Sequence, residues 1–371
     1  MHLETLLLQS QDNTLGYIMN IVYMAMFFVF MVWGQKIQMM IMLRDVEYAL
    51  SRLKLTRDEA RRATIENVKR VGKPQQDPTA YVDRYLEYVL IQPVSMDPAG
   101  IVGKFDHLLN ITDERIKDEI RAIAPGATES QQFNLINLLE IAQTLNTFYR
   151  VIRHYYVFGK KTSSYFLIIQ IQMILPLLMR EAEALLGAVH AFTYGHPVGD
   201  SAGAIVAARM MYGHEMSDIA KDTVSTEIDY EGRRVIAIKS KGPGGTVGRP
   251  GDAVATILKR RKAISSVLMV DAGLKLEGEK SGEIFEGIGA AIGGIGTEKF
   301  KIEEIVTKKK VPLYGVIIKM SNQEALCPLT QEIMAGVEQA VERIKSLIRE
   351  KTKVGDTVLL VGVGNTMGVA Q

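Results

Sequence analysis

The stretch VLMVDAG at residues 267–273 has the pattern of a fully buried strand that ends on an acidic side chain, Asp271. Three further runs of the same β-type composition follow or precede it: RRVIAIK at 233–239, LYGVIIKM at 313–320 and TVLLVGVG at 357–364. Unbroken runs of branched apolar residues are typical of parallel strands that are covered on both faces. Helical patterns separate them, at 252–262, 282–293, 301–310 and 330–351. This alternation predicts a three-layer α/β domain with a mostly parallel sheet over residues 196–371.

Two aspartates lie where such a sheet places its ligands. GDSAG at 199–203 puts Asp200 in a turn just before a predicted helix, whose N-terminal end favours an anion. Asp271 ends its strand, and binding sites in α/β sheets lie at the carboxyl ends of the strands. We therefore expect Asp200 and Asp271 to form a two-carboxylate site. The alternatives are that Asp200 caps its helix and that Asp271 caps the next turn.

Acidic residues after Asp271 suggest a metal site. If the predicted helix extends through Glu279, Glu283 and Glu286, these side chains share one face. A divalent cation held by Asp200, Asp271 and Glu279 is then one hypothesis, since carboxylates are its usual ligands. A solvated acidic helix face is the alternative. The six histidines show no zinc-binding spacing.

A glycine-rich loop follows the strand at 233–239. Its sequence, KSKGPGGTVGRPGD at 239–252, combines Lys239, Gly244, Gly245 and Arg249. Backbone N–H groups in such a loop can hold a phosphate or carboxylate, which predicts a nucleotide- or anion-sensing site. The spacing fits neither the P-loop nor the dinucleotide-binding pattern, so a plain β–α connection or a lid is the alternative.

The whole-chain composition limits the function classes. The 371 residues carry a net charge of +2, so nothing indicates a strongly basic nucleic-acid-binding face. The single cysteine excludes an intrachain disulfide. The length allows two domains with their own cores.

Residues 15–35, LGYIMNIVYMAMFFVFMVWGQ, carry no charged side chain and are long enough to span a bilayer as a helix. Basic residues follow this segment, and Glu4 and Asp12 precede it. The positive-inside rule then predicts a single-pass protein of the cell membrane, with residues 1–14 outside and the rest in the cytoplasm. A buried core helix is the alternative. A second apolar stretch, at 165–179, contains glutamines and a proline and is expected to be a buried or partly interfacial helix; a second membrane span is the alternative.

Residues 36–195 are predicted to form a helical domain. Its start carries a coiled-coil-like 4-3-4-3 seam, formed by Met39, Leu43, Val46, Leu50 and Leu53. The seam indicates either a homo-oligomer or packing on the chain's own helices. Thr56 and Thr112 are predicted to cap helices in this region.

Taken together, the anchor and the region DAGLKLEGEKSGEIFEGIGAAIGGIG at 271–296 resemble an uncharacterised archaeal membrane-anchored family, a domain of unknown function. GDSAGAIVA and VLMVDAG also resemble the turn, helix and strand of hydrogenase maturation proteases and spore germination proteases. In those enzymes a V-x-G-x-G-N strand comes first, whereas here VLLVGVGN at 358–365 comes last, as in a circular permutation. Peptidyl-tRNA hydrolases share that general fold and strand.

This resemblance implies a site for hydrolysis. The two aspartates that act in the spore proteases match Asp200 and Asp271, and Asn365 matches an asparagine that could orient substrate. The maturation proteases use a metal with a histidine ligand that has no clear counterpart here. We therefore expect a membrane-anchored hydrolase of amide or ester bonds. The alternatives are a non-enzymatic membrane scaffold and the nucleotide- or anion-sensing domain described above.

Overall fold

The computed structural model describes residues 2–91, 100–261, 263–294 and 296–370, with side chains from residue 16 onward except residue 32. The chain folds into two compact units. The first comprises Met1–Leu55 and Thr147–Met179, and the second comprises Thr56–Asn146 and Arg180–Gln371. Each unit is described by itself below.

Three helices contribute to the first unit: the beginning of α1 (His2–Gly72), the end of α4 (Glu129–Thr162) and the beginning of α5 (Tyr165–Tyr194). In the seam of α1, Val46, Leu50 and Leu53 are buried within the single chain. The side chain of Gln172 on α5 donates a hydrogen bond to Asp45 on α1, at 3.4 Å. The buried part of the seam therefore packs on the chain's own helices.

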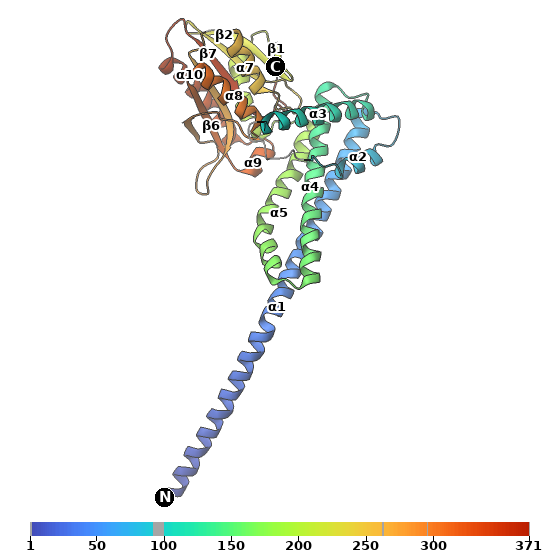
Figure 1. Ribbon diagram of the computed structural model, residues 1–371, viewed down its shortest axis with the longest axis vertical. Coiled ribbons are helices and arrows are strands. Elements are labelled where there is room, and N and C mark those ends of the chain that lie inside the picture. Colours follow the sequence, from blue (N-terminus) through green and yellow to red (C-terminus); the bar gives the residue numbers. More distant parts are fainter. Residues whose placement is uncertain (1, 92–99, 262, 295, 371) are drawn as a thin grey trace. The chain divides into compact units, whose positions relative to one another are not determined.

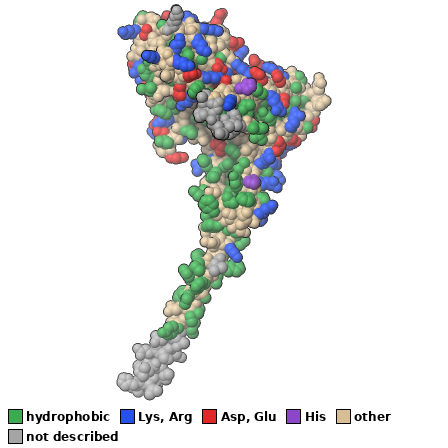
Figure 2. Space-filling view, in the orientation of Figure 1, with side chains coloured by type: hydrophobic (Ala, Val, Ile, Leu, Met, Phe, Trp, Pro, Cys, Tyr) green, Lys and Arg blue, Asp and Glu red, His purple; other side chains and the backbone are tan. Residues whose placement is uncertain are grey.

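The apolar surface of this unit bears on the membrane prediction. Among the described residues, α5 is the one helix that by itself is long and apolar enough to cross a membrane. The parts Gly16–Met31 and Trp33–Gly72 of α1 are bent by 41° relative to each other, and together they would make a second span. Within the chain, 22% of the apolar window of α5 is buried. Figure 2 shows hydrophobic side chains lying open along α1.

The helical part of the second unit includes the rest of α1, α4 and α5 together with α2 (Thr79–Leu86) and α3 (Ile101–Ile123). Both predicted threonine caps are wrong. α1 runs through Thr56 without a break, and Thr112 lies inside α3, where its hydroxyl donates to the carbonyl oxygen of Leu108 at 2.8 Å. A threonine hydroxyl can bond to its own helix in this way, so the capping pattern did not mark a helix end.

A seven-stranded sheet forms the centre of the second unit (Figure 1). Its strand order is β1-β2-β3-β7-β4-β6-β5. The strands are β1 (Ser217–Ala220), β2 (Thr223–Tyr230), β3 (Arg233–Ser240), β4 (Ser266–Leu274), β5 (Ile284–Ile288), β6 (Leu313–Met320) and β7 (Thr357–Gly362). The four central strands β3, β7, β4 and β6 are parallel. β1, β2 and β5 are antiparallel to their neighbours. The sheet is therefore mixed and not mostly parallel as predicted, because antiparallel strands extend both edges.

The edge strand β5 replaces the helix predicted at 282–293. Gly282 and Gly289 have positive φ angles of 82° and 126°, a backbone conformation that a right-handed helix does not contain. Between them the chain pairs with β6, from Ile284 opposite Ile318 to Ile288 opposite Tyr314. The acidic side chains of this region therefore do not share a helix face.

Helices cover both faces of the sheet. On one face α6 (Ala202–Met211) and α10 (Gln331–Lys351) pack on alternate strand residues such as Leu268 and Leu360. On the other, α7 (Pro250–Arg260) and α8 (Thr297–Lys309) pack on the intervening residues, such as Val267 and Leu359. The side-chain period of two sends successive residues of one strand into two separate cores. The predicted three-layer α/β organisation is present, and the short α9 (Asn322–Leu326) follows β6.

Candidate functional site

Asp200 lies in a single turn of 3-10 helix, η1 (Gly199–Ser201), that leads directly into α6. Two glycines allow this turn to sit against the sheet. A Cβ on Gly199 would lie 2.1 Å from the carbonyl oxygen of Glu324, and one on Gly203 would lie 2.3 Å from that of Val270. Any larger residue would push the turn away from the strand ends. The GDSAG sequence therefore fixes the position of Asp200.

Asp271 lies near the carboxyl end of β4 and is only 6% exposed. Its two carboxyl oxygens accept hydrogen bonds from two backbone N–H groups, Ala272 at 2.8 Å and Gly293 at 3.2 Å. Gly293 belongs to the glycine-rich segment that follows β5. This segment therefore closes over the end of β4 and holds the carboxyl group of Asp271 in place.

The turn after β7 connects the third motif to the first. The backbone N–H of Asn365 donates a hydrogen bond to Oδ2 of Asp200 at 2.9 Å. Gly364 has a φ of +123°, and a Cβ there would lie 1.9 Å from the carbonyl oxygen of Asp200. The Asn365 side chain instead accepts a hydrogen bond from the N–H of Met367, at 2.8 Å. Asn365 therefore acts on Asp200 through its backbone.

A cavity of about 440 Å³ joins the two aspartates. Asp200, Asp271 and Gly364 line it together with the loop at 247–250 and with residues 292–294 and 296 of the glycine-rich segment. Leu109 of α3 and Glu298 of α8 complete its wall. The helical part of the second unit therefore contributes to a site whose acidic groups come from the α/β part.

The aspartate pair binds protons more tightly than ordinary carboxyl groups. Burial, together with the negative charge of Asp200, raises the pKa of Asp271 to about 8. Burial also raises the pKa of Asp200, and the hydrogen bond from Asn365 opposes that rise. Two interacting carboxyl groups in one poorly solvated cavity lose their protons in separate steps. At neutral pH Asp271 therefore holds its proton.

Glu279, the third predicted metal ligand, is not part of this arrangement. Its carboxylate pairs with Lys319 at 2.6 Å and accepts a hydrogen bond from the N–H of Leu276 at 2.8 Å. Across the described part of the chain, no three histidine, cysteine or acidic side chains are grouped so that they could hold a metal ion. The side chains present thus supply two carboxylates and do not fit a three-ligand metal centre.

The four residues of the predicted anion site serve other purposes. Lys239 is buried, its Nζ donates to the carbonyl oxygen of Ser240, and burial lowers its pKa to about 8. The N–H of Gly245 is bound to the side chain of Asn134 at 3.0 Å. Gly244 packs closely on Ser130, where an added Cβ would come within 2.8 Å of its Cα. These contacts hold the loop against the helical part of the unit.

Arg249 is enclosed by acidic side chains. Its guanidinium pairs with Asp113 at 2.6 Å and lies 4.0 Å from both Asp106 and Glu298. It also donates to the side chain of Asn110 at 2.7 Å. A guanidinium held by three carboxylates is neutralised within the protein, so the structure uses Arg249 to tie its loop to α3 and α8.

Sequence reasoning missed the contribution of α3 to the site. Leu109 lines the aspartate cavity and Asp113 holds the neighbouring loop through Arg249. These residues precede Asp200 by a long stretch of chain and carry no motif. The amphipathic pattern of α3 was the one available signal. It indicates that one face of the helix is buried, but it does not identify what that face contacts.

Fold and site together define a class: a mixed-sheet α/β domain with a buried aspartate pair at the carboxyl ends of its central strands, closed on one side by helices. Residues 20–195 match the family model described as "Protein of unknown function (DUF1512) N-terminal domain", and residues 198–370 match "Domain of unknown function (DUF1512) C-terminal". With both domain models matched in order, the chain belongs to the DUF1512 family. No curated protein matches the chain. The family description names no activity.

Proposed function

We propose that the protein is a hydrolase of amide or ester bonds that uses Asp200 and Asp271 as a metal-independent catalytic pair. The observation that carries this proposal is the shared cavity, in which burial and the charge of Asp200 raise the pKa of Asp271 to about 8. A carboxylate beside a carboxylic acid provides a general base and a general acid at the same pH.

The proposed reaction uses both protonation states. The Asp200 carboxylate accepts a proton from a water molecule while the water oxygen bonds to the substrate carbonyl carbon. The Asp271 carboxylic acid donates its proton to the carbonyl oxygen, which gives a neutral tetrahedral intermediate. Collapse of that intermediate breaks the bond to the leaving group, which takes the proton from Asp200. The proton on the intermediate returns to Asp271, so the pair is restored.

The hydrogen bonds of the pair support this division of roles. The N–H of Asn365 stabilises negative charge on Asp200, which favours Asp200 as the base. Asp271 is more deeply buried in the protein, and burial favours its neutral form. The likeness of the GDSAG and VLMVDAG motifs to those of the spore proteases agrees with a peptide or ester substrate.

The test is hydrolysis of a panel of fluorogenic N-acylated aminoacyl amides and esters by the detergent-purified full chain. We expect activity that declines as the pH rises through about 8, where Asp271 loses its proton. Asp200→Asn and Asp271→Asn should each lower kcat at least about 100-fold, the scale of a lost general acid or base. Asp218→Asn, at an exposed position on β1, is the matched control. Equal rates in the wild type and both site variants would overturn the proposal.

We further propose that residues 15–35 anchor the protein in the cell membrane, with the N-terminus outside. The large apolar side chains that are described between Tyr17 and Trp33 are all exposed, by 47% to 78%. Such a surface is unfavourable in water and favourable in lipid. The basic residues that follow support the orientation. Extraction of membranes with alkaline carbonate should leave the full chain in the membrane and release a variant that lacks residues 1–35.

A further inference from the structure

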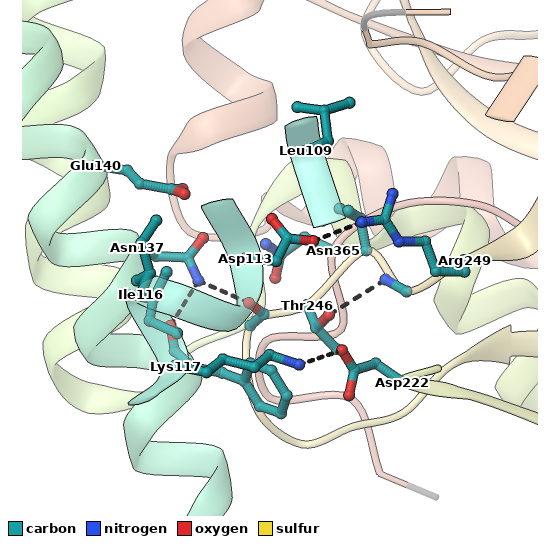
Figure 3. Close-up of a pocket in the computed structure, with 15 residues that line it drawn as sticks. Leu109, Asp113, Ile116, Lys117, Asn137, Glu140, Asp222, Thr246, Arg249 and Asn365 are labelled. Atoms are coloured by element: carbon teal, nitrogen blue, oxygen red, sulfur yellow. Dashed lines mark hydrogen bonds and ion pairs between the residues drawn. The ribbon is translucent and has the colours of Figure 1, made fainter. Parts of the chain in front are cut away.

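A second cavity of about 270 Å³ adjoins the aspartate cavity (Figure 3). The two cavities share four lining residues, Leu109 and the loop residues Val247, Gly248 and Arg249. The turn after β7 also connects them, since Gly364 lines the first and its neighbour Asn365 lines the second. A substrate held at the aspartates therefore has a continuation of the site beside it.

The second cavity has apolar walls and a rigid floor. Leu109 and Ile116 of α3 and Phe133 and Ile136 of α4 line it. The side-chain amide of Asn137 donates to the carbonyl oxygens of Phe133 and Gly245, at 2.7 and 2.6 Å. These bonds fasten α4 to the loop at 245–249. The cavity is therefore preformed, and it can accommodate an aliphatic chain.

The charges of this cavity do not balance. Asp113 is paired with Arg249 at 2.6 Å, and Asp222 with Lys117 at 2.5 Å. Glu140 of α4 is the third acidic group in the lining, and among the described residues no cation pairs with it. In Figure 3 its carboxyl group points toward the side of the cavity where Asp113 lies. Three acidic groups thus face two basic ones, and the excess negative charge is at Glu140.

The surroundings of Glu140 favour a positively charged partner. Burial of the carboxyl group and the negative charge of Asp113 raise the pKa of Glu140 to about 7. Part of the Glu140 residue is exposed, so a cation can reach its carboxyl group and offset its negative charge. The described residues provide no three-ligand group for a metal ion. The apolar walls suit a cation at the end of an aliphatic stem.

We propose that this cavity binds a lysine or arginine side chain of the substrate, with Glu140 as its ion-pair partner. The proposal rests on the proposed hydrolase function, and it deepens it by naming the substrate class: a peptide or protein with a basic residue next to the bond that is cleaved. Asp113 and Asp222 add to the attraction only weakly, since Arg249 and Lys117 neutralise them.

The test measures binding without turnover. The full chain carrying Asp200→Asn and Asp271→Asn is titrated calorimetrically with N-acetyl-arginine amide and N-acetyl-lysine amide at about pH 8. We expect saturable binding, and we expect Glu140→Gln to weaken it about two- to fivefold, the scale of an ion pair with an exposed acidic residue. Glu129→Gln, on the exposed first turn of the same helix, should leave the Kd unchanged. The neutral probe N-acetyl-norleucine amide, which lacks only the ammonium group of the lysine probe, should bind about two- to fivefold more weakly.

The pH dependence provides an independent readout. Binding should strengthen between about pH 6 and pH 8 as the carboxyl group of Glu140, which lies beside Asp113, ionises. Equal affinities for the basic and neutral probes, or an unchanged Kd in Glu140→Gln, would overturn the proposal. Loss of hydrolysis does not enter this assay. Binding that depends on Glu140 in a chain that hydrolyses nothing would refute the proposed enzyme and leave a cation-binding site.

Discussion

Replacing Asp271 by asparagine should make the folded chain less stable than the wild type at acid pH and more stable than the wild type at alkaline pH. In the folded chain the pKa of Asp271 is raised from 3.8 to about 8, so the folded state holds a proton that the unfolded state has lost. The stability due to this group is fully present below about pH 4 and is lost as the pH rises to about 8. Each pH unit in that window removes about 1.4 kcal/mol, or about 4 kcal/mol between pH 5 and pH 8.

The asparagine variant has no such pH-dependent loss, but it has a constant one. An amide offers one acceptor oxygen where the carboxyl group offers two, so the N–H of Ala272 or of Gly293 loses its partner. An unsatisfied buried donor costs about 1–3 kcal/mol at any pH. Asp271→Asn should therefore be less stable than the wild type near pH 5 and more stable near pH 8.

The measurement is thermal and urea unfolding of the detergent-purified full chain, followed by far-UV circular dichroism over this pH range. Asp218→Asn, at an exposed position, controls for the loss of one negative charge. The difference between Asp271→Asn and the wild type should change by about 4 kcal/mol from pH 5 to pH 8. A difference that stays constant, or that changes in the opposite direction, would refute the reasoning about the buried pair.

Three further perturbations test the packing around the site and the seam. Gly364→Ala should destabilise the chain by at least about 3 kcal/mol in urea unfolding, because its Cβ would lie 1.9 Å from a backbone oxygen of η1. The control is Gly355→Ala, which has a positive φ but open space around it and should cost about 1 kcal/mol. Arg249→Met removes the ion-pair partner of Asp113, whereas Asp106 and Glu298 keep Lys301, and a loss of about 1–3 kcal/mol in urea unfolding is expected, most of it suppressed at low pH. Val46→Asp should make the first unit sensitive to proteolysis, because Val46 is buried, whereas Met40→Asp should not, because Met40 is 65% exposed. If the Val46→Asp chain dissociates in sedimentation but resists proteolysis, the seam joins separate chains.

The central strands and the aspartate pair could be predicted from local sequence for a physical reason. A strand buried on both faces must be apolar throughout, and this leaves an unbroken signal such as VLMV before Asp271. Carboxyl ends of parallel strands meet at one edge of a sheet, which is enough to bring Asp271 near the turn after β7. Asp200 lies beside them because Gly199 and Gly203 have no Cβ, which lets the chain around Asp200 pack closely against α9 and β4.

The edges of the sheet were missed because their signal is weaker. β2 alternates polar and apolar residues, and the turn to β3 consists of Glu231 and Gly232, both with positive φ. Two such residues are the hallmark of a tight hairpin, so the signal was present but short. The helix predicted at 282–293 failed for the opposite reason. Its charged and apolar spacing was helical, but its glycines favoured an edge strand.

The contacts of Arg249 could not be predicted at all. A loop arginine beside glycines has the same sequence pattern whether it is free to bind an anion or already neutralised. The difference lies in Asp106 and Asp113, which belong to a helix far away in the sequence. The position of Glu140 could not be predicted either. Among the described residues no cation pairs with it, and this depends on which helices and loops surround the cavity.

The order of the strands has a consequence for how the protein is made. β7, the latest strand in the sequence, is inserted between β3 and β4, and the turn after it completes the surroundings of Asp200. While the chain is being synthesised, β3 and β4 are present without the strand that joins them, and their facing edges have no partner. Any chain interrupted before Thr357 keeps both aspartates in its sequence but has no continuous sheet to position them. Such incomplete chains would lack the assembled site and be prone to proteolysis, so the late strand restricts the site to molecules whose synthesis has passed β7.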